Sequence, residues 1–189
     1  MDQTYTIREL TGEECWPLMK EHQRSVFEDI HSYNPANLFN EAEQATIKTL
    51  EQSMGSPFKL YLGVFDADNN FVGWSWGTQE SGSVFYMVNS GVLKEHRRKG
   101  IYSALLEKST EILSQKGFQL IYSRHSATNN AVLIPKLKAG FIISKMEIDD
   151  RFGVLIHLHF YTNKIRRKLM DYRVGLLKPD AEIRKVFGA

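Results

Sequence analysis

The sequence predicts one α/β domain of the α+β type, with a mixed, largely antiparallel sheet flanked by helices and followed by a helical C-terminal tail. Two observations lead to this prediction. Three strand-like segments in residues 59–92 are joined by short polar turns, which is typical of an antiparallel meander. Residues 101–116 then have helical spacing and precede another strand-like segment, an order that requires a parallel crossover.

The segments before the meander predict one strand and two helices. Residues 5–10 alternate in polarity like a strand, and Thr11 with Glu14 has the spacing of a capping box that opens a helix. Residues 31–40 are predicted to form a polar loop. Residues 41–53 follow as a second helix, which a Gly-Ser-Pro sequence ends.

The middle strand of the meander has two unlike faces. We expect Val72, Trp74 and Trp76 to share one face, while the intervening Gly and Ser residues leave the other face nearly bare. A helix or a ligand is therefore expected to approach that face closely. The three strands of the meander are predicted at residues 59–65, 71–77 and 83–92.

Helical and strand-like segments alternate after the meander. Apolar residues follow helical spacing in residues 101–116, and Gly117 is placed to end that helix. A strand at residues 118–126 and a short helix between Asn129 and Gly140 follow. Two final strands, at residues 141–148 and 154–160, are predicted to form a hairpin.

Composition limits the classes of function. The net charge is +2, which by itself does not indicate nucleic acid or a membrane surface. Cys15 is the single cysteine, and the first ten residues lack the pattern of a secretory signal, so we expect a reducing cytoplasmic location. No run of about 18 apolar residues predicts a membrane span.

The charge is concentrated in residues 162–189, where eight Lys or Arg residues face three acidic ones, a net charge of +5. Ile165, Leu169, Tyr172 and Leu176 recur at helical spacing, so this segment is predicted to be a basic amphipathic extension of a domain formed by residues 1–161. Such a tail binds an anionic surface or nucleic acid, or packs on its own domain or on a second subunit. We expect no nucleic acid or membrane partner, and a homodimer is possible.

The start of the helix at residues 101–116 carries cations where a helix already presents partial positive charge. Arg97, Arg98 and Lys99 each cost about 0.3–1 kcal/mol there unless an anion is bound. Residues 95–102 contain no Ser, Thr, Asp or Asn to cap the free amides, and Gly100 permits close approach of a ligand. The pattern indicates a phosphate-bearing ligand, with a solvated basic turn as the alternative.

Nucleotide-binding motifs do not explain this turn, because the chain has neither G-x-x-x-x-G-K-[ST] nor G-x-G-x-x-G. Instead it resembles the pyrophosphate motif Q/R-x-x-G-x-G/A of the GNAT superfamily of acyl-CoA-dependent N-acyltransferases. Arg97 and Gly100 match, and Tyr102 replaces the last small residue. A second family segment, an Asn, a short helix and Gly-Phe, matches Asn129 through Phe141, so the resemblance spans residues 5–160.

The resemblance implies a sheet splayed between the strand that ends near Val92 and the parallel strand around Ile121, with the pantetheine arm of acetyl-CoA, or of another acyl-CoA, in the gap. No metal is implied. Backbone groups would hold the thioester arm on the first strand and the pyrophosphate at the turn. The residues expected to bind this co-substrate are Gly91, Val92, Leu93, Arg97, Arg98, Lys99, Gly100, Ile101, Tyr102 and Asn129.

Acyl transfer to an amine needs a proton acceptor for the amine, an oxyanion donor and an acid for the leaving thiolate. The resemblance places the oxyanion donor on the backbone near Val92. Where the family often has a Tyr as the acid, this chain has Lys136, which is able to stabilise a thiolate as a cation or to contact a CoA phosphate. Glu80 and His125 are the nearest candidates for the base; His125 otherwise has a structural role, and a base acting through water leaves no trace in the sequence.

Two further patterns are weak. His157 and His159 share one face of a strand, but two ligands without a third rarely form a metal site. Residues 66–70 begin like a calcium loop, yet Phe71 and Gly77 occupy the positions that require Gly and Glu, so we predict a hairpin turn.

The sequence therefore predicts an N-acyltransferase, in the first place an N-acetyltransferase, that acts on a primary amine of a small molecule or peptide. We expect direct transfer, because Cys15 is far in sequence from the thioester region. The acceptor would enter beside residues 31–40 and the two early helices. The alternative is a catalytically silent module that binds acyl-CoA for regulation.

Overall fold

The computed structural model describes residues 4–27 and 35–188 and has the predicted α/β architecture. Residues 31–34 of the predicted polar loop lie outside the described residues. The strands are β1 (Thr6–Leu10), β2 (Lys59–Phe65), β3 (Phe71–Ser81), β4 (Val84–Val92), β5 (Leu120–Ser126), β6 (Ile142–Asp149) and β7 (Gly153–Tyr161). The helices are α1 (Gly12–Val26), α2 (Glu41–Ser53), α3 (Ile101–Gln115), α4 (Asn130–Lys138), α5 (Lys164–Arg173) and α6 (Ala181–Val186), with the 3-10 helices η1 (Pro35–Leu38) and η2 (Lys94–His96).

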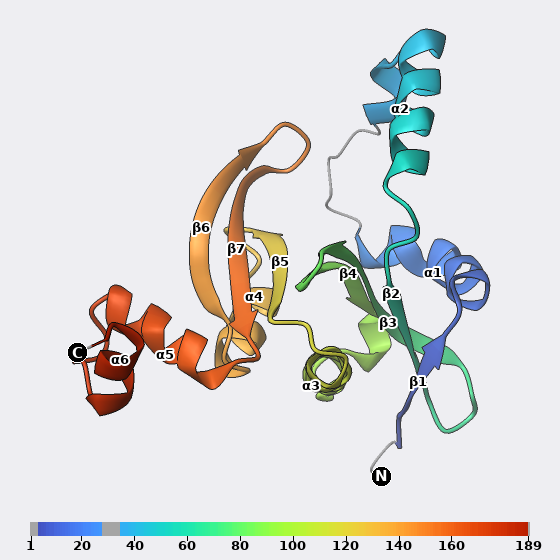
Figure 1. Cartoon of the computed structure of the whole chain (residues 1–189). Coiled ribbons are helices and arrows are strands. Elements are labelled where there is room, and N and C mark those ends of the chain that lie inside the picture. Colours follow the sequence, from blue (N-terminus) through green and yellow to red (C-terminus); the bar gives the residue numbers. More distant parts are fainter. Residues whose placement is uncertain (1–3, 28–34, 189) are drawn as a thin grey trace.

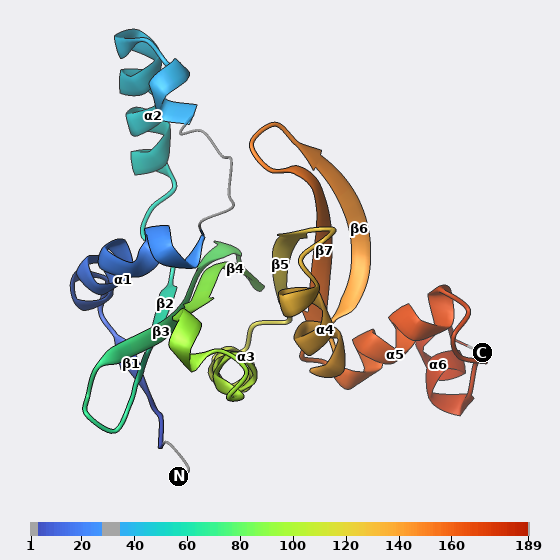
Figure 2. The ribbon, with the colours of Figure 1, turned by 180° about the vertical axis from the view of Figure 1, so that it is seen from behind.

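One mixed sheet runs through the molecule in the order β1-β2-β3-β4-β5-β7-β6. Every neighbouring pair is antiparallel except β4 with β5, which α3 joins by the predicted crossover. The parallel pairing is short: it ends at Tyr86 and Tyr122, and the strands then move apart (Figure 2). We call this divergence, between residues 87–92 of β4 and residues 123–126 of β5, the fork.

Helices cover both faces of the sheet (Figure 1). On one face α1 packs its buried Cys15 and Met19 against Tyr61 and Trp74. On the other face α3 and α4 pack against the sheet and form the larger core, which continues across both arms of the fork. Apolar residues from four strands meet apolar residues from the two helices there. The strand residues include Leu62 of β2, Phe85 of β4, Ile121 of β5 and Leu158 of β7, and the helix residues include Leu105 and Leu113 of α3 and Leu133 of α4.

The sequence analysis placed Val72 on the wrong face of β3, because β3 has a bulge opposite β2. The register shifts between Val64 and Phe65, so Val72 turns into the α3 core while Trp74 remains in the cluster against α1. Trp76 packs on that second cluster as predicted. The bare face is confirmed as a close helix contact, because Ser75 lies in a small hollow with Ser109 of α3.

Both early helices begin with the hydrogen bonds of a capping box. The side chain of Thr11 accepts from the Glu14 amide while the Glu14 carboxylate accepts from the Thr11 amide, and Asn40 with Glu43 repeats the arrangement at α2. Although α2 has the predicted bounds, none of its residues is buried, and the helix projects away from the sheet (Figure 1).

The C-terminal tail folds back on the domain beside β7. Arg167 of α5 donates to the carbonyl oxygen of Gly140, just beyond α4, and also pairs with Asp171 at 3.0 Å. Ile183 of α6 is completely buried. The predicted helical spacing holds only in part, since α5 ends at Arg173 and Leu176 lies beyond it. None of the helices within the described ranges has the length and apolar character needed to cross a membrane.

Candidate active site

The basic turn before α3 leads into a helix start that has no side-chain cap. Gly100, the N-cap residue, has a φ of 80° and makes no side-chain cap hydrogen bond, and Arg98 also has a positive φ of 62°. Turns that combine right-handed and left-handed residues make concave groups of N–H donors that bind anions. Arg98, Lys99 and Gly100 are exposed, so the turn is open to a ligand. Ile101 is buried in the α3 core and fixes the first turn of the helix.

Arg97 has a different role from its neighbours. Its Nε donates to the Val92 carbonyl at 3.0 Å, and a terminal nitrogen reaches the Val26 carbonyl at the end of α1 at 3.5 Å. A cation at a helix C-terminus interacts favourably with the helix dipole. Arg97 therefore ties the turn to β4 and α1, and Arg98 and Lys99 are exposed beside it.

At the end of β4, the backbone amides of Val92 and of the following residue, Leu93, point in different directions. The Leu93 amide donates to Val72 at 2.9 Å, and its carbonyl accepts from His96 at 2.9 Å, so both groups of Leu93 are used. Hydrogen bonding alternates along an antiparallel pair, so the Val92 amide points away from β3 and into the fork. Gly91 is required by packing, because a Cβ there would lie 2.6 Å from the Trp74 ring.

Lys136 is buried at the base of the fork. Its side chain exposes 1% of its surface, and Nζ lies 3.4 Å from Met87 Sδ on β4 and 4.5 Å from the Phe141 ring centre. No carboxylate in the described ranges forms an ion pair with this lysine. Burial lowers the pKa of Lys136 to about 7, so the ammonium and the neutral amine are both well populated at physiological pH. An unpaired buried lysine is costly, which marks it as a functional candidate.

His125 lies on the same face of the sheet as Lys136. Its Nε2 is 2.9 Å from the hydroxyl of Ser123, a completely buried residue. Burial, together with the nearby charge of Lys136, lowers the pKa of His125 to about 3. His125 is therefore neutral at pH 7 and a weak base, and the structure places it as a neighbour of the acid candidate.

Glu80 lies across the sheet from these two residues and accepts a hydrogen bond from the Tyr122 hydroxyl. Side chains alternate along β5, so Tyr122 and His125 point to opposite faces. The Tyr122 ring stacks on Tyr86 at 4.9 Å, and these two residues are the last β4–β5 pair before the fork opens. Burial and the bond to Glu80 raise the pKa of Tyr122 above its usual range.

Tyr86 and Tyr122 are candidate site residues that the sequence analysis did not predict. The crossover predicts that β4 and β5 are parallel but not which residues are paired, and the register alone brings these tyrosines to the fork. The sequence does contain one signal for this pairing. In each strand a Tyr directly follows a large apolar residue, Phe85 before Tyr86 and Ile121 before Tyr122.

A polar network continues from the tyrosines across β5, β7 and β6. Arg124 donates to the Tyr86 hydroxyl at 3.3 Å and pairs with Glu147 at 2.9 Å and Asp149 at 3.6 Å. His157 is hydrogen-bonded to Glu147, and this bond holds the pKa of Glu147 below its usual range. Two carboxylates, Glu147 and Asp149, therefore flank the Arg124 guanidinium.

The remaining predicted residues lie at the two helix starts that follow the arms of the fork. Asn129 is the N-cap residue of α4 but makes no side-chain cap bond, so its exposed amide is free to contact a ligand. Tyr102 is half-buried in the first turn of α3, and burial raises its pKa above the usual range.

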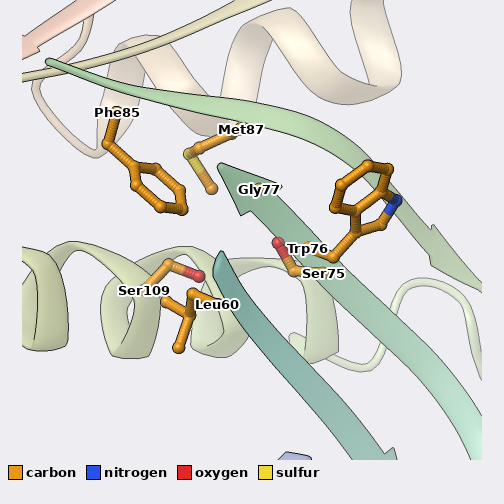
Figure 3. Close-up of a pocket in the computed structure, with 7 residues that line it drawn as sticks. All are labelled: Leu60, Ser75, Trp76, Gly77, Phe85, Met87 and Ser109. Atoms are coloured by element: carbon orange, nitrogen blue, oxygen red, sulfur yellow. The ribbon is translucent and has the colours of Figure 1, made fainter. Parts of the chain in front are cut away.

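A small hollow under Met87 contains no open binding site. It is too narrow for a water molecule, so it is a packing gap between the sheet and α3. Figure 3 shows its lining residues, Leu60, Ser75, Trp76, Gly77, Phe85, Met87 and Ser109.

Two other kinds of chemistry have little support. Cys15 is completely buried under α1, and burial raises the pKa of its thiol to about 11, which makes it a poor nucleophile. His157 and His159 do share a face, since both rings contact Tyr122. Residues 4–27 and 35–188 contain no group of three His, Cys, Asp or Glu side chains placed to hold a metal ion.

A parallel strand pair that forks before an uncapped basic helix start is the arrangement expected from the resemblance to acyl-CoA-dependent transferases. The model of the acetyltransferase (GNAT) family matches residues 16–141, two-thirds of the chain, and the chain belongs to this family. It is an acetyltransferase of the GNAT type. No curated protein matches the chain in sequence.

Many solved structures share the fold at low identity. The ribosomal-protein-S18-alanine N-acetyltransferase of Escherichia coli is 16% identical with a TM-score of 0.60, covering 85% of this chain and 95% of that one. The phosphinothricin acetyltransferase of Sinorhizobium meliloti, solved with acetyl-CoA, has the same two values and covers 85% and 89%. A spermidine N-acetyltransferase mutant of Vibrio cholerae is 15% identical, with a TM-score of 0.60 and coverage of 85% and 95%. Their acceptors differ, so the shared fold does not identify the acceptor of this chain.

Proposed function

We propose that the protein transfers an acyl group, in the first place acetyl, directly from acyl-CoA to a primary amine at the fork. The observation that carries this proposal is Lys136, a fully buried amine without an ion-pair partner among the described residues, at the point where β4 and β5 separate. The amides from Arg98 to Tyr102 would bind the pyrophosphate. The Val92 amide, which points into the fork, would donate to the developing oxyanion.

Lys136 has the role of the acid. Its ammonium donates a proton to the leaving thiolate when the C–S bond breaks, and its charge stabilises the thiolate before the transfer. Met87 and Phe141 exclude water around Nζ, so this electrostatic effect is stronger than at an exposed lysine.

Glu80 and Tyr122 form the proton acceptor on the opposite face. The amine proton passes to the Tyr122 oxygen while the Tyr122 proton passes to the Glu80 carboxylate, so no free tyrosinate is needed. The acid and the base then lie on opposite sides of the sheet. The amine would approach from the face of Tyr86 and Arg124, and the thiolate would leave toward α4.

The experiment combines calorimetry with acetyl-CoA and a free-thiol assay with a panel of primary amines. We expect acetyl-CoA to bind and thiol to be released only with an acceptor. Tyr122→Phe should lower kcat about 100-fold while the Kd of acetyl-CoA is unchanged, because the phenol acts only on the amine. Binding without turnover for any amine would favour the regulatory acyl-CoA module, and absence of binding would refute the proposal.

A further inference from the structure

Helix α2 lacks the packing that a helix of its length needs. Its 13 residues include none that is buried. Isolated helices shorter than about 12–15 residues are marginal in water, and most helical stability in proteins comes from tertiary packing. Ile47, Leu50 and Met54 recur at helical spacing and form what we call the α2 stripe; Leu50 is 61% and Met54 75% exposed. The helix has a net charge of −2, from three acidic residues (Glu41, Glu43 and Glu51) and one basic residue (Lys48).

The tail carries a surface of the opposite charge. Five large apolar side chains in this segment are exposed by 42–71%, and we call them the tail patch: Val174, Leu176, Leu177, Val186 and Phe187. Lys178 and Lys185 are exposed beside them. Neither of these lysines forms a salt bridge in the portion of the chain that the structure describes, whereas Lys168 is paired with Asp180 and Glu182.

We propose that a second copy of the chain covers both surfaces, with the α2 stripe of each protomer seated on the tail patch of the other. Acidic residues surround one apolar surface and basic residues the other, so their contact pairs opposite charges around an apolar centre. Within one chain the two surfaces cannot meet, because α2 and the α5–α6 tail lie at opposite ends of the molecule in both views (Figures 1 and 2).

A twofold axis satisfies this arrangement. Two copies lying side by side in opposite directions place each α2 on the other copy's tail, so both contacts form at once and the assembly closes as a dimer. A single contact repeated head to tail would instead give open chains. We infer the closed dimer, because it leaves neither apolar surface exposed.

Charge reversal distinguishes this interface from any other. In one variant Lys178→Glu and Lys185→Glu reverse the tail; in a second, Glu41→Lys and Glu51→Lys reverse α2. Each variant alone places like charges at both contacts, so sedimentation velocity should show at least a tenfold weaker dimer. An equimolar mixture of the two variants has opposite charges at both contacts and should restore the dimer as a heterodimer. Lys20→Glu with Arg24→Glu, exposed on α1, is the matched control and should leave the dimer unchanged.

Other occupants predict other results. An anionic membrane on the tail patch would give a monomer that binds phosphatidylserine vesicles through the tail, with no effect of the α2 reversal. A dimer through another surface would survive both reversals. Either outcome, or a wild-type chain that stays monomeric at 100 μM protein or that forms open chains, overturns the proposal. Acetyl-CoA binding by each variant serves as the folding control.

Discussion

At the scale of single residues, Lys136 decides whether the site is catalytic. In the proposed mechanism its ammonium protonates the thiolate, and burial lowers its pKa to about 7, so kcat should fall as the pH rises through about 7. Lys136→Arg keeps a cation at every accessible pH and should move this loss to higher pH. Lys136→Met should lower kcat about 100-fold or more, a typical loss for a general acid. Stopped-flow thiol release across pH 6–9 measures all three.

The exposed Lys138 on the same helix is the matched control. Lys138→Met should keep the wild-type pH profile, because its side chain does not face the fork. A Lys136→Met variant with the wild-type kcat and pH profile would remove Lys136 from the mechanism.

The same lysine should also affect folding stability. A lysine whose folded pKa is lowered destabilises the fold fully below that pKa, and the penalty disappears as the pH rises to the unfolded pKa. For Lys136 the window runs from about 7 to the ordinary 10.5. Over this window wild-type stability should gain about 1.4 kcal/mol per pH unit from this group.

Lys136→Met should therefore raise the free energy of unfolding at pH 7, by an amount that shrinks toward pH 10.5. Urea titrations at several pH values measure the difference between the two proteins, in which the other titrating groups cancel. A difference that does not change with pH would show that Lys136 is not held in a low-dielectric site.

At the scale of elements, the turn before α3 is the part of the site that the sequence describes best. A helix start with three cations and no capping residue is visible in the sequence, and the structure shows the left-handed Gly100 without a side-chain cap. A Cβ at Gly100 would meet no atom within 4 Å, so the backbone angle alone requires glycine. Gly100→Ala should cost about 1–2 kcal/mol of stability and distort the amide donors.

The measurement is the Kd of acetyl-CoA by calorimetry, which should rise about tenfold in Gly100→Ala, a loss of about 1.4 kcal/mol in binding. Gly82→Ala is the matched control, because Gly82 also has open space around it but no left-handed backbone angle. Equal affinities in the two variants would mean that the pyrophosphate does not bind at this turn.

Periodicity and turn residues predicted the elements and their order, because strand alternation, helical spacing and caps are local properties. The bounds of α2 and β2 match the sequence prediction residue for residue. Register is not local: the β3 bulge moved Val72 to the other face, and the β4–β5 pairing brought Tyr86 to Tyr122. Local pattern therefore indicates the proposed anion site, while the proposed proton acceptor depends on contacts between distant strands.

At the scale of the whole molecule, the basic tail is attached to the domain at a few defined points. Thr162 bonds twice to the domain: its amide donates to Gln119, and its hydroxyl donates to Phe118 at 2.7 Å. Arg167 reaches the carbonyl of Gly140 at the end of α4, the helix that carries Lys136. The tail has its own buried centre at Ile183. A boundary between residues 161 and 162 stays a prediction that truncation can test.

Deleting residues 162–189 should leave a folded domain that binds acetyl-CoA with unchanged affinity, because the turn before α3 makes no use of the tail. The carbonyl oxygens of Gly140, Gln119 and Phe118 lose their partners, which at about 0.5–1.5 kcal/mol per hydrogen bond should cost about 1.5–4.5 kcal/mol and lower Tm by roughly 3–18 °C. The looser end of α4 should lower kcat while the Kd stays constant. Arg167→Leu in the full chain should reproduce the kcat loss, whereas Arg173→Leu, whose guanidinium stacks on Phe187 within the tail, should not. A truncated chain that unfolds at 25 °C would show that the tail belongs to the core domain, since the loss of these three hydrogen bonds is too small to unfold it.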